Sequence, residues 1–177
     1  MARGSEPAER SRLSSTQGYV QELLDAVEHG TPALLAVGDA ASARRPAPGK
    51  WSPREIIGQL VDSATHNHQR FVRAQFQDDL VFTGYAQDVW VATQRYQEAP
   101  WTELIALWGA LNRHLARVMV AVPEPVRLRE HRRHNLHEMA WHPVPAGEAT
   151  SLDYFMGDYV GHLQHHLRQI LGPTWAA

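Results

Sequence analysis

Hydrophobic residues recur with the 3.6-residue period of an α-helix in the last long segment of the chain. On a helical wheel of about 100° per residue, one side of residues 151–171 carries Leu152, Tyr159, Leu163, Leu167 and Ile170. Thr150, with Asp153 at capping-box spacing, or Ser151 can cap the start of this segment, and Gly172-Pro173 provides a stop. We therefore predict a complete amphipathic helix here.

The first part of the chain predicts two helical pieces followed by a loop. Apolar positions between residues 15 and 29 follow the helical period, and Gly30 is expected to end this helix. Thr31 and Pro32 have the pattern of an N-cap and a first helical position, which predicts a second piece to about Ala40. Residues 41–50 contain two prolines and a glycine and are expected to form a loop.

The middle of the chain predicts two more long helices. Ser52 and Glu55 have capping-box spacing with Pro53 at the first helical position, so a helix is expected from here to about Phe76. Residues 102–122 form another periodic segment that ends before a proline, and residues 86–97 predict a short helix.

Long amphipathic helices without alternating strands predict an all-α fold, an antiparallel four-helix bundle with additional short helices. We expect one domain over residues 15–172, an N-terminal tail at 1–14 and a C-terminal tail at 173–177. The chain has 177 residues, which suits a single domain with a substantial core.

Composition excludes several classes of site. The chain has no cysteine, which rules out disulfides, thiolate zinc sites and a cysteine nucleophile. A formal net charge of −2 gives no general case for nucleic acid or an anionic membrane. No apolar run is long enough to span a membrane, and residues 1–14 lack the apolar core of a signal peptide. We therefore expect a cytoplasmic protein.

Two histidines of the last predicted helix lie at the spacing of metal ligands. His162 and His166 fall on the shoulder of the apolar face, whereas His165 faces water. Side chains four residues apart on a helix are neighbours, so these two imidazoles can share one cation. The same positions also suit histidines that form hydrogen bonds within a core. The wheel alone leaves both interpretations open.

A polar shoulder runs beside the core face of the helix predicted from residue 53. It carries Gln59, Ser63, His66, Asn67 and Arg70. Buried polar groups need partners, because an unpaired one costs about 1–3 kcal/mol. These side chains either form hydrogen bonds with one another and with other helices, or they line a pocket.

Arginine and histidine are concentrated between residues 127 and 142. Such a charge run is typical of a solvated loop, and binding of phosphate or nucleic acid through it is a weaker interpretation. His137 and His142 flank a glutamate, but they are five residues apart and so do not share a helix face as zincin ligands do.

Two stretches together resemble the DinB/YfiT family of bacterial four-helix-bundle proteins. They are KWSPREIIGQLVDS at 50–63 and DYVGHLQHHLRQI at 158–170, and the resemblance extends over about residues 23–171. Residues 85–96 and 107–114 are similar to a YfiT-like subgroup. The resemblance implies a divalent metal, commonly nickel or zinc, bound by three histidines.

Carried over to this sequence, the family's two last-helix ligands fall on His162 and His166. The ligand of the second helix falls on Gln59, where the family has histidine. An amide oxygen is a poorer donor than imidazole for zinc or nickel, so Gln59 could either bind the metal weakly or donate to the histidines in a metal-free cluster. Asp62 and His66 are candidates for a nearby catalytic base.

The resemblance implies a metal-dependent hydrolase or a transferase that uses a small-molecule thiol as cosubstrate, and a homodimer. The alternative, which Gln59 favours, is a small-molecule-binding or stress-related scaffold with a degenerate, metal-free site. Nothing in the sequence names the substrate.

Overall fold

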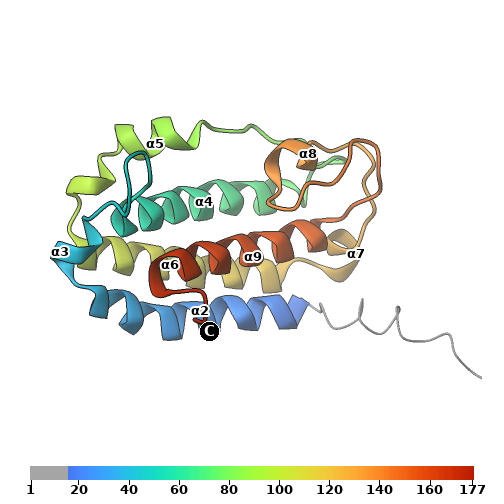
Figure 1. The fold of residues 1–177 in the computed structure, drawn as a ribbon. Coiled ribbons are helices and arrows are strands. Elements are labelled where there is room, and N and C mark those ends of the chain that lie inside the picture. Colours follow the sequence, from blue (N-terminus) through green and yellow to red (C-terminus); the bar gives the residue numbers. More distant parts are fainter. Residues whose placement is uncertain (1–15) are drawn as a thin grey trace, which may run out of the picture.

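Four long helices lie side by side in the computed structural model, which describes residues 16–177 (Figure 1). They are α2 (Thr16–Val37), α4 (Pro53–Arg73), α6 (Trp101–Ala121) and α9 (Leu152–Leu171). The shorter elements are α3 (Asp39–Ser42), α5 (Gln87–Thr93), the 3₁₀ helix η1 (Tyr96–Glu98), α7 (Glu124–Arg127) and α8 (Leu136–Met139). The prediction of an all-α four-helix bundle with extra short helices is confirmed. The predicted tail at residues 1–14 lies outside the described residues.

The long connection between α4 and α6 decides the direction of the helices. After α4 ends, the chain runs back along the bundle through α5 and η1 before α6 begins (Figure 1). As a result α4 and α6 run in the same direction, opposite to α2 and α9, so not every neighbouring pair is antiparallel.

The start of α4 is fixed by the expected local interactions. The Ser52 hydroxyl accepts a hydrogen bond from the Glu55 backbone N–H at 3.3 Å, and the Ser52 N–H donates to the Glu55 carboxylate at 2.8 Å. Pro53 occupies the first helical position. The helix ends at Arg73, one turn earlier than the predicted Phe76.

Gly30 does not end the first helix, and the prediction of two separate pieces is wrong. Helix α2 continues through Gly30 and Pro32 to Val37. Gly30 is buried at a close approach, because an added Cβ would lie 3.4 Å from the Trp108 ring and 3.7 Å from Leu167. Packing of α2 against both α6 and α9 therefore overrides the local helix-stop signal.

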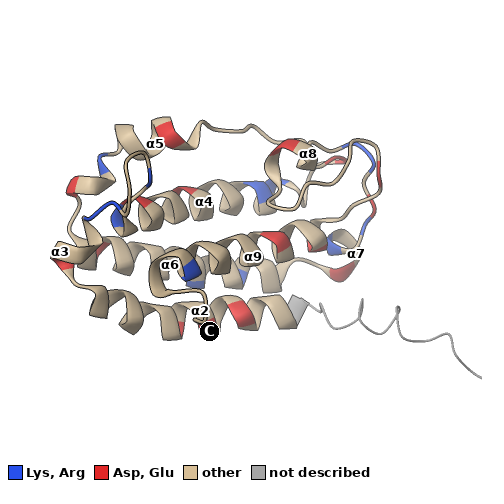
Figure 2. Ribbon diagram, in the orientation of Figure 1, with Lys and Arg blue, Asp and Glu red and all other residues tan. Residues whose placement is uncertain are grey.

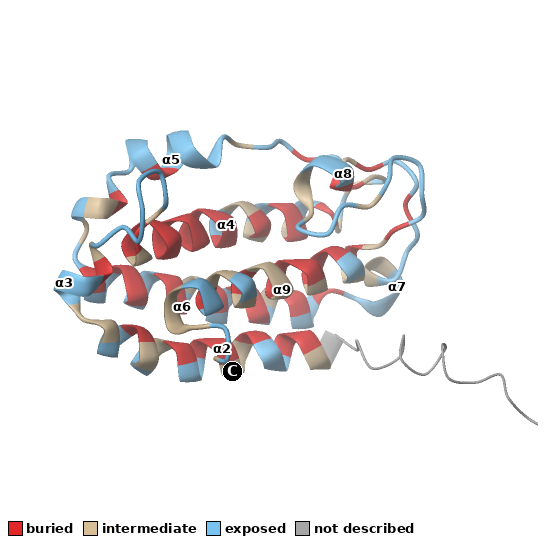
Figure 3. Ribbon diagram, in the orientation of Figure 1, coloured by how far each residue is buried: buried red, intermediate tan, exposed pale blue. Residues whose placement is uncertain are grey.

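The core fills the space between the four long helices, whose inward faces are buried (Figure 3). Trp101 anchors α6 to α2, because its indole N–H donates to the Leu34 carbonyl at 2.9 Å. The largest fully buried side chains include Trp101, Trp108, Phe71, Leu23, Leu34, Ile57 and Leu60.

Most charged side chains of the Arg/His-rich segment are exposed, as expected of a solvated loop, but its backbone is held against neighbouring segments. His131 and His134 are buried, and His131 exchanges two backbone hydrogen bonds with Thr150. The charges of this segment alternate around the right-hand end of the bundle (Figure 2). Arg129 and Arg133 pair with Asp78 and Asp79 from the segment after α4. The two segments thus brace each other.

Ser151, rather than Thr150, caps α9 by accepting a hydrogen bond from the Tyr154 backbone N–H. Asp153 does not complete a capping box, since its carboxylate instead binds the Tyr19 hydroxyl and the Arg127 guanidinium. Among the described residues, no helix is both long and apolar enough to cross a membrane.

Candidate functional site

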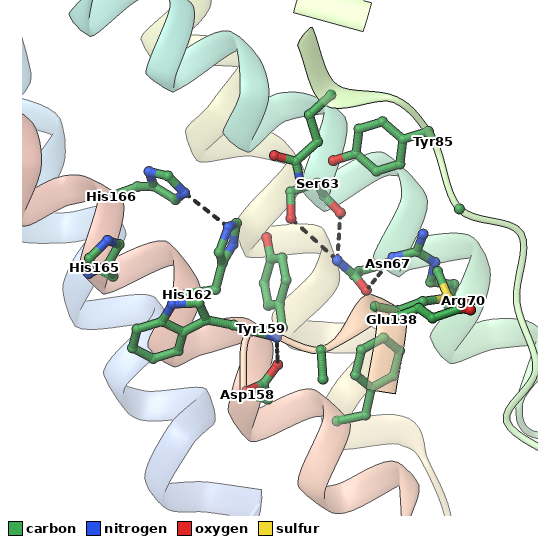
Figure 4. A pocket seen from close by; sticks show the side chains of 16 residues that line it. Ser63, Asn67, Arg70, Tyr85, Glu138, Asp158, Tyr159, His162, His165 and His166 are labelled. Atoms are coloured by element: carbon green, nitrogen blue, oxygen red, sulfur yellow. Dashed lines mark hydrogen bonds between the residues drawn. The ribbon is translucent and has the colours of Figure 1, made fainter. Parts of the chain in front are cut away.

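A polar cavity of about 480 Å³ opens between α4, α9, the segment before α5 and the segment that includes α8 (Figure 4). This volume is in the range of small-molecule sites. The polar residues that line it are Ser63, Asn67, Arg70, Tyr85, Gln87, Glu138, Asp158, Tyr159, His162, His165 and His166.

His162 and His166 meet at one side of this cavity. Their Nε2 atoms are 3.0 Å apart, and their rings are nearly perpendicular at 82°. Gln169 fixes the tautomer of His166, because its Oε1 is 2.9 Å from Nδ1 and an amide oxygen only accepts. The Nε2 atom of His166 therefore directs a lone pair towards His162.

Both imidazoles are neutral at pH 7. Burial lowers the pKa of His162 to about 3, with further lowering from His166 and His165. Burial also lowers the pKa of His166, against an opposing contribution from its hydrogen bond to Gln169. Neutral imidazole is the form that binds metal ions.

The spacing of the two nitrogens fits a shared metal ion. Two nitrogen ligands of a tetrahedral zinc, each about 2.0–2.1 Å from the ion, lie about 3.3 Å apart. The observed separation of 3.0 Å needs only a small widening to reach this value. However, no group of three histidine, cysteine or acidic side chains suited to a metal occurs within the described part of the chain. A third protein ligand would have to be of another type.

Gln59 is fully buried on α4, but it does not line the cavity. Neither atom of its amide group has a hydrogen-bond partner. The Tyr85 side chain does line the cavity. Burial raises the pKa of Tyr85 to about 12, and the nearby Gln59 amide opposes part of this rise. Gln59 thus places two buried amide atoms without a hydrogen-bond partner next to the Tyr85 side of the cavity wall.

Asp62 binds residues of the connection between α4 and α6 and does not line the cavity. Its Oδ1 accepts hydrogen bonds from the Tyr96 hydroxyl at 2.7 Å and from the Gln94 amide at 2.6 Å, while its Oδ2 has no partner. Burial raises the pKa of Asp62, and the bonds to Gln94 and Tyr96 oppose this effect.

His66 also lies outside this cavity, in a second one of about 620 Å³. Its ring stacks on Tyr85 with centroids 4.0 Å apart and meets Trp90 edge-on at 4.4 Å. Its Nδ1 is 2.9 Å from the Asp62 backbone carbonyl. The structure therefore brings the two α9 histidines together and leaves Asp62 and His66 apart from them.

Sequence reasoning missed how loop residues complete the cavity wall. Asp158 accepts hydrogen bonds from the backbone N–H groups of Trp141 and His142, which holds this segment on α9. The Trp141 ring then covers Gly161, where an added Cβ would lie 2.9 Å from the indole. The glycine directly before His162 was the available signal of this close approach.

A hydrogen bond inside the bundle fixes the floor of the cavity. The Tyr159 hydroxyl donates to the Asn112 side chain at 2.5 Å, and the Asn112 amide donates to the Trp108 carbonyl at 2.8 Å. Burial raises the pKa of Tyr159. This phenol is accordingly a fixed donor and not an acid near neutral pH.

This arrangement of helices is also found in a solved structure. Neither a protein-family model nor a curated protein matches the sequence. Among solved structures, YfiT from Bacillus subtilis matches 96% of this chain and 87% of its own, with a TM-score of 0.71 and 17% sequence identity. The fold is that of YfiT. That protein is described as a probable metal-dependent hydrolase with an unusual four-helix bundle topology. At this identity the YfiT comparison establishes the shared fold, and the chemistry has to be argued from the residues present here.

Proposed function

We propose that the protein is a metal-dependent hydrolase of the YfiT type, with His162 and His166 as ligands of a divalent metal, nickel or zinc. The observation that carries the proposal is the pair of neutral imidazoles, with Nε2 atoms 3.0 Å apart, at the side of a polar cavity. The description of YfiT as a probable metal-dependent hydrolase supports it.

Gln59 is the proposed third protein ligand, through its amide oxygen. Its two unpartnered amide atoms support this role, although the side chain has to turn towards the cavity. A bound divalent metal would lower the pKa of water and so supply a nucleophile near neutral pH. The chain itself contributes the fixed tautomer of His166. Asp62 and His66 are less favoured as bases, because neither lines the cavity.

The same site suits transfer to a small-molecule thiol as a second reaction, since a metal that activates water also activates a thiol. The competing proposal is a metal-free binding scaffold. It is favoured by the glutamine at position 59 and by the lack of a third strong ligand in residues 16–177.

Metal analysis of protein purified without chelator tests the proposal. We expect about one equivalent of nickel or zinc, lost in His162→Ala and in His166→Ala. His165→Ala is the matched control, because His165 is the exposed histidine of the same helix and its Nε2 lies 3.0 Å from the Gln169 amide nitrogen rather than against the pair. Its metal content should equal that of the parent protein.

Gln59→His tests the third ligand. Restoring an imidazole at this position should raise metal affinity by at least about tenfold, because imidazole is the better donor for zinc and nickel. Absence of metal in the parent, together with no change in melting temperature on adding nickel or zinc, would favour the scaffold instead.

A further inference from the structure

A buried arginine without an acidic partner lies in the same cavity as the histidine pair. Arg70 on α4 is only 8% exposed. Its Nη2 donates to the Thr83 carbonyl at 3.1 Å, and its Nη1 lies 3.4 Å from the Asn67 side-chain oxygen. Within the described part of the chain, no carboxylate forms an ion pair with it.

Nearby acidic groups are committed elsewhere. Asp158 accepts hydrogen bonds from two backbone N–H groups and from the His142 ring. Glu138 is largely exposed and lies beside His137. Both line the cavity, but neither forms an ion pair with Arg70, whose hydrogen bonds go to two neutral oxygen acceptors. A buried guanidinium charge without an ion-pair partner is unfavourable unless a counterion binds to it.

Arg70 and the histidine pair face the cavity from opposite sides. Figure 4 shows Tyr159, Ser63 and Asn67 between them. The second cavity, of about 620 Å³, also includes Arg70, and no acidic residue lines it. A negatively charged group therefore has access to the guanidinium, and a ligand bound there extends towards His162 and His166.

We propose that Arg70 is the anchor for the carboxylate of a small organic acid, which is the substrate class of this cavity. The planar guanidinium fork matches the two oxygens of a carboxylate. One buried cation balances one negative charge, which favours a carboxylate over a doubly charged phosphate. The inference rests on the proposed function only for the reaction at the other end of the ligand; binding by Arg70 does not require the metal.

Binding of benzoate to metal-stripped protein tests this assignment, with the uncharged benzamide as the matched probe and inorganic phosphate as the third. Titration calorimetry at constant ionic strength should detect benzoate but neither benzamide nor phosphate. Arg70→Met should weaken benzoate binding by at least about tenfold. The affinity of Arg70→Lys for benzoate should lie between those of the parent and Arg70→Met, because lysine keeps the charge but lacks the planar guanidinium. Arg117→Met is the matched control, since Arg117 is exposed on α6 and lines neither cavity; it should bind benzoate unchanged.

Thermal stability separates an anchor from a structural arginine. Arg70→Met should melt no lower than the parent protein, because it removes a buried charge that lacks a counterion. Benzoate should raise the melting temperature of the parent but not that of the variant. Binding of phosphate in preference to benzoate would overturn the carboxylate class. A lower melting temperature of Arg70→Met with unchanged benzoate binding would overturn the anchor itself.

The two proposals fail separately. Benzoate binding that depends on Arg70, together with no nickel or zinc in protein purified without chelator, would leave this inference standing and remove the metal site. Stoichiometric metal that depends on His162, with no benzoate binding, would do the reverse.

Discussion

The Tyr96 ring lies directly on the backbone of Gly58. A Cβ at Gly58 would be 2.2 Å from two carbons of this ring, closer than real contacts allow. This approach sets the Tyr96 hydroxyl against Asp62 and ties η1 to α4. A glycine one residue before the proposed ligand Gln59 thus controls how the connection between α4 and α6 packs.

Gly58→Ala should destabilise the protein by about 1–3 kcal/mol, because the ring or the helix has to move. Chemical denaturation measures the change. Gly157→Ala is the matched control on α9, where an added Cβ makes only an ordinary contact, 3.5 Å from Tyr19. It should stabilise by up to about 1 kcal/mol through helix propensity. Equal effects at the two positions would contradict the packing described here.

Gln59→Leu should increase the free energy of unfolding of the metal-free protein by about 1 kcal/mol, because a buried amide without partners is replaced by an apolar side chain. Asn112→Leu is the matched control, since Asn112 is equally buried but has hydrogen bonds at both ends of its amide. It should lose stability. Gln59→Leu should also bind metal more weakly. If it instead lowers stability and leaves metal affinity unchanged, the Gln59 amide has hydrogen-bond partners in solution.

Asp62→Asn should change the pH dependence of stability. Burial raises the pKa of Asp62 in the folded protein. The protonated carboxyl is therefore compatible with folding below the unfolded-state pKa, and stability is lost as pH rises through the folded-state pKa and the buried group becomes charged. The gain in stability from the substitution should accordingly be largest at neutral pH and decrease towards pH ~4. Denaturation between these pH values measures it. Asp88→Asn, at an exposed site on α5, controls for the change in net charge; a gain that grows on acidification would contradict the burial of Asp62.

Tyr159→Phe should reduce stability by about 1–2 kcal/mol, because it leaves the buried Asn112 oxygen without its donor. Tyr154→Phe is the control, as its hydroxyl donates to the His142 carbonyl from a residue that is 41% exposed. We expect a smaller loss there. Thermal denaturation of both variants compares the two hydrogen bonds directly.

Local sequence signals were sufficient to predict most helices, and they failed where contacts with distant parts of the chain determine the structure. The start of α4 could be predicted because Ser52 and Glu55 interact across a single turn. Gly30 has the local pattern of a helix end, but its small size serves the contact with Trp108, which comes from another helix. The buried state of His131 likewise depends on Thr150, far along the chain.

The same distinction applies to the candidate site. His162 and His166 could be paired from sequence because one helix holds both. Arg70 was recognisable as part of a polar shoulder, but its lack of a carboxylate partner depends on where the segments after α4 and before α9 lie. Whether Gln59 joins the histidines remains a prediction, and the metal affinity of Gln59→His is its test.

The position of Trp141 over Gly161 gives the protein an intrinsic optical reporter. The indole lines the cavity and lies 5.4 Å from the His165 ring, within a few ångströms of the helix that carries both proposed ligands. Nickel or another quenching ion at that place would reduce its emission, and a Trp141→Phe variant identifies its share of the signal. Occupancy of the cavity can therefore be followed by fluorescence in real time, without attaching a label.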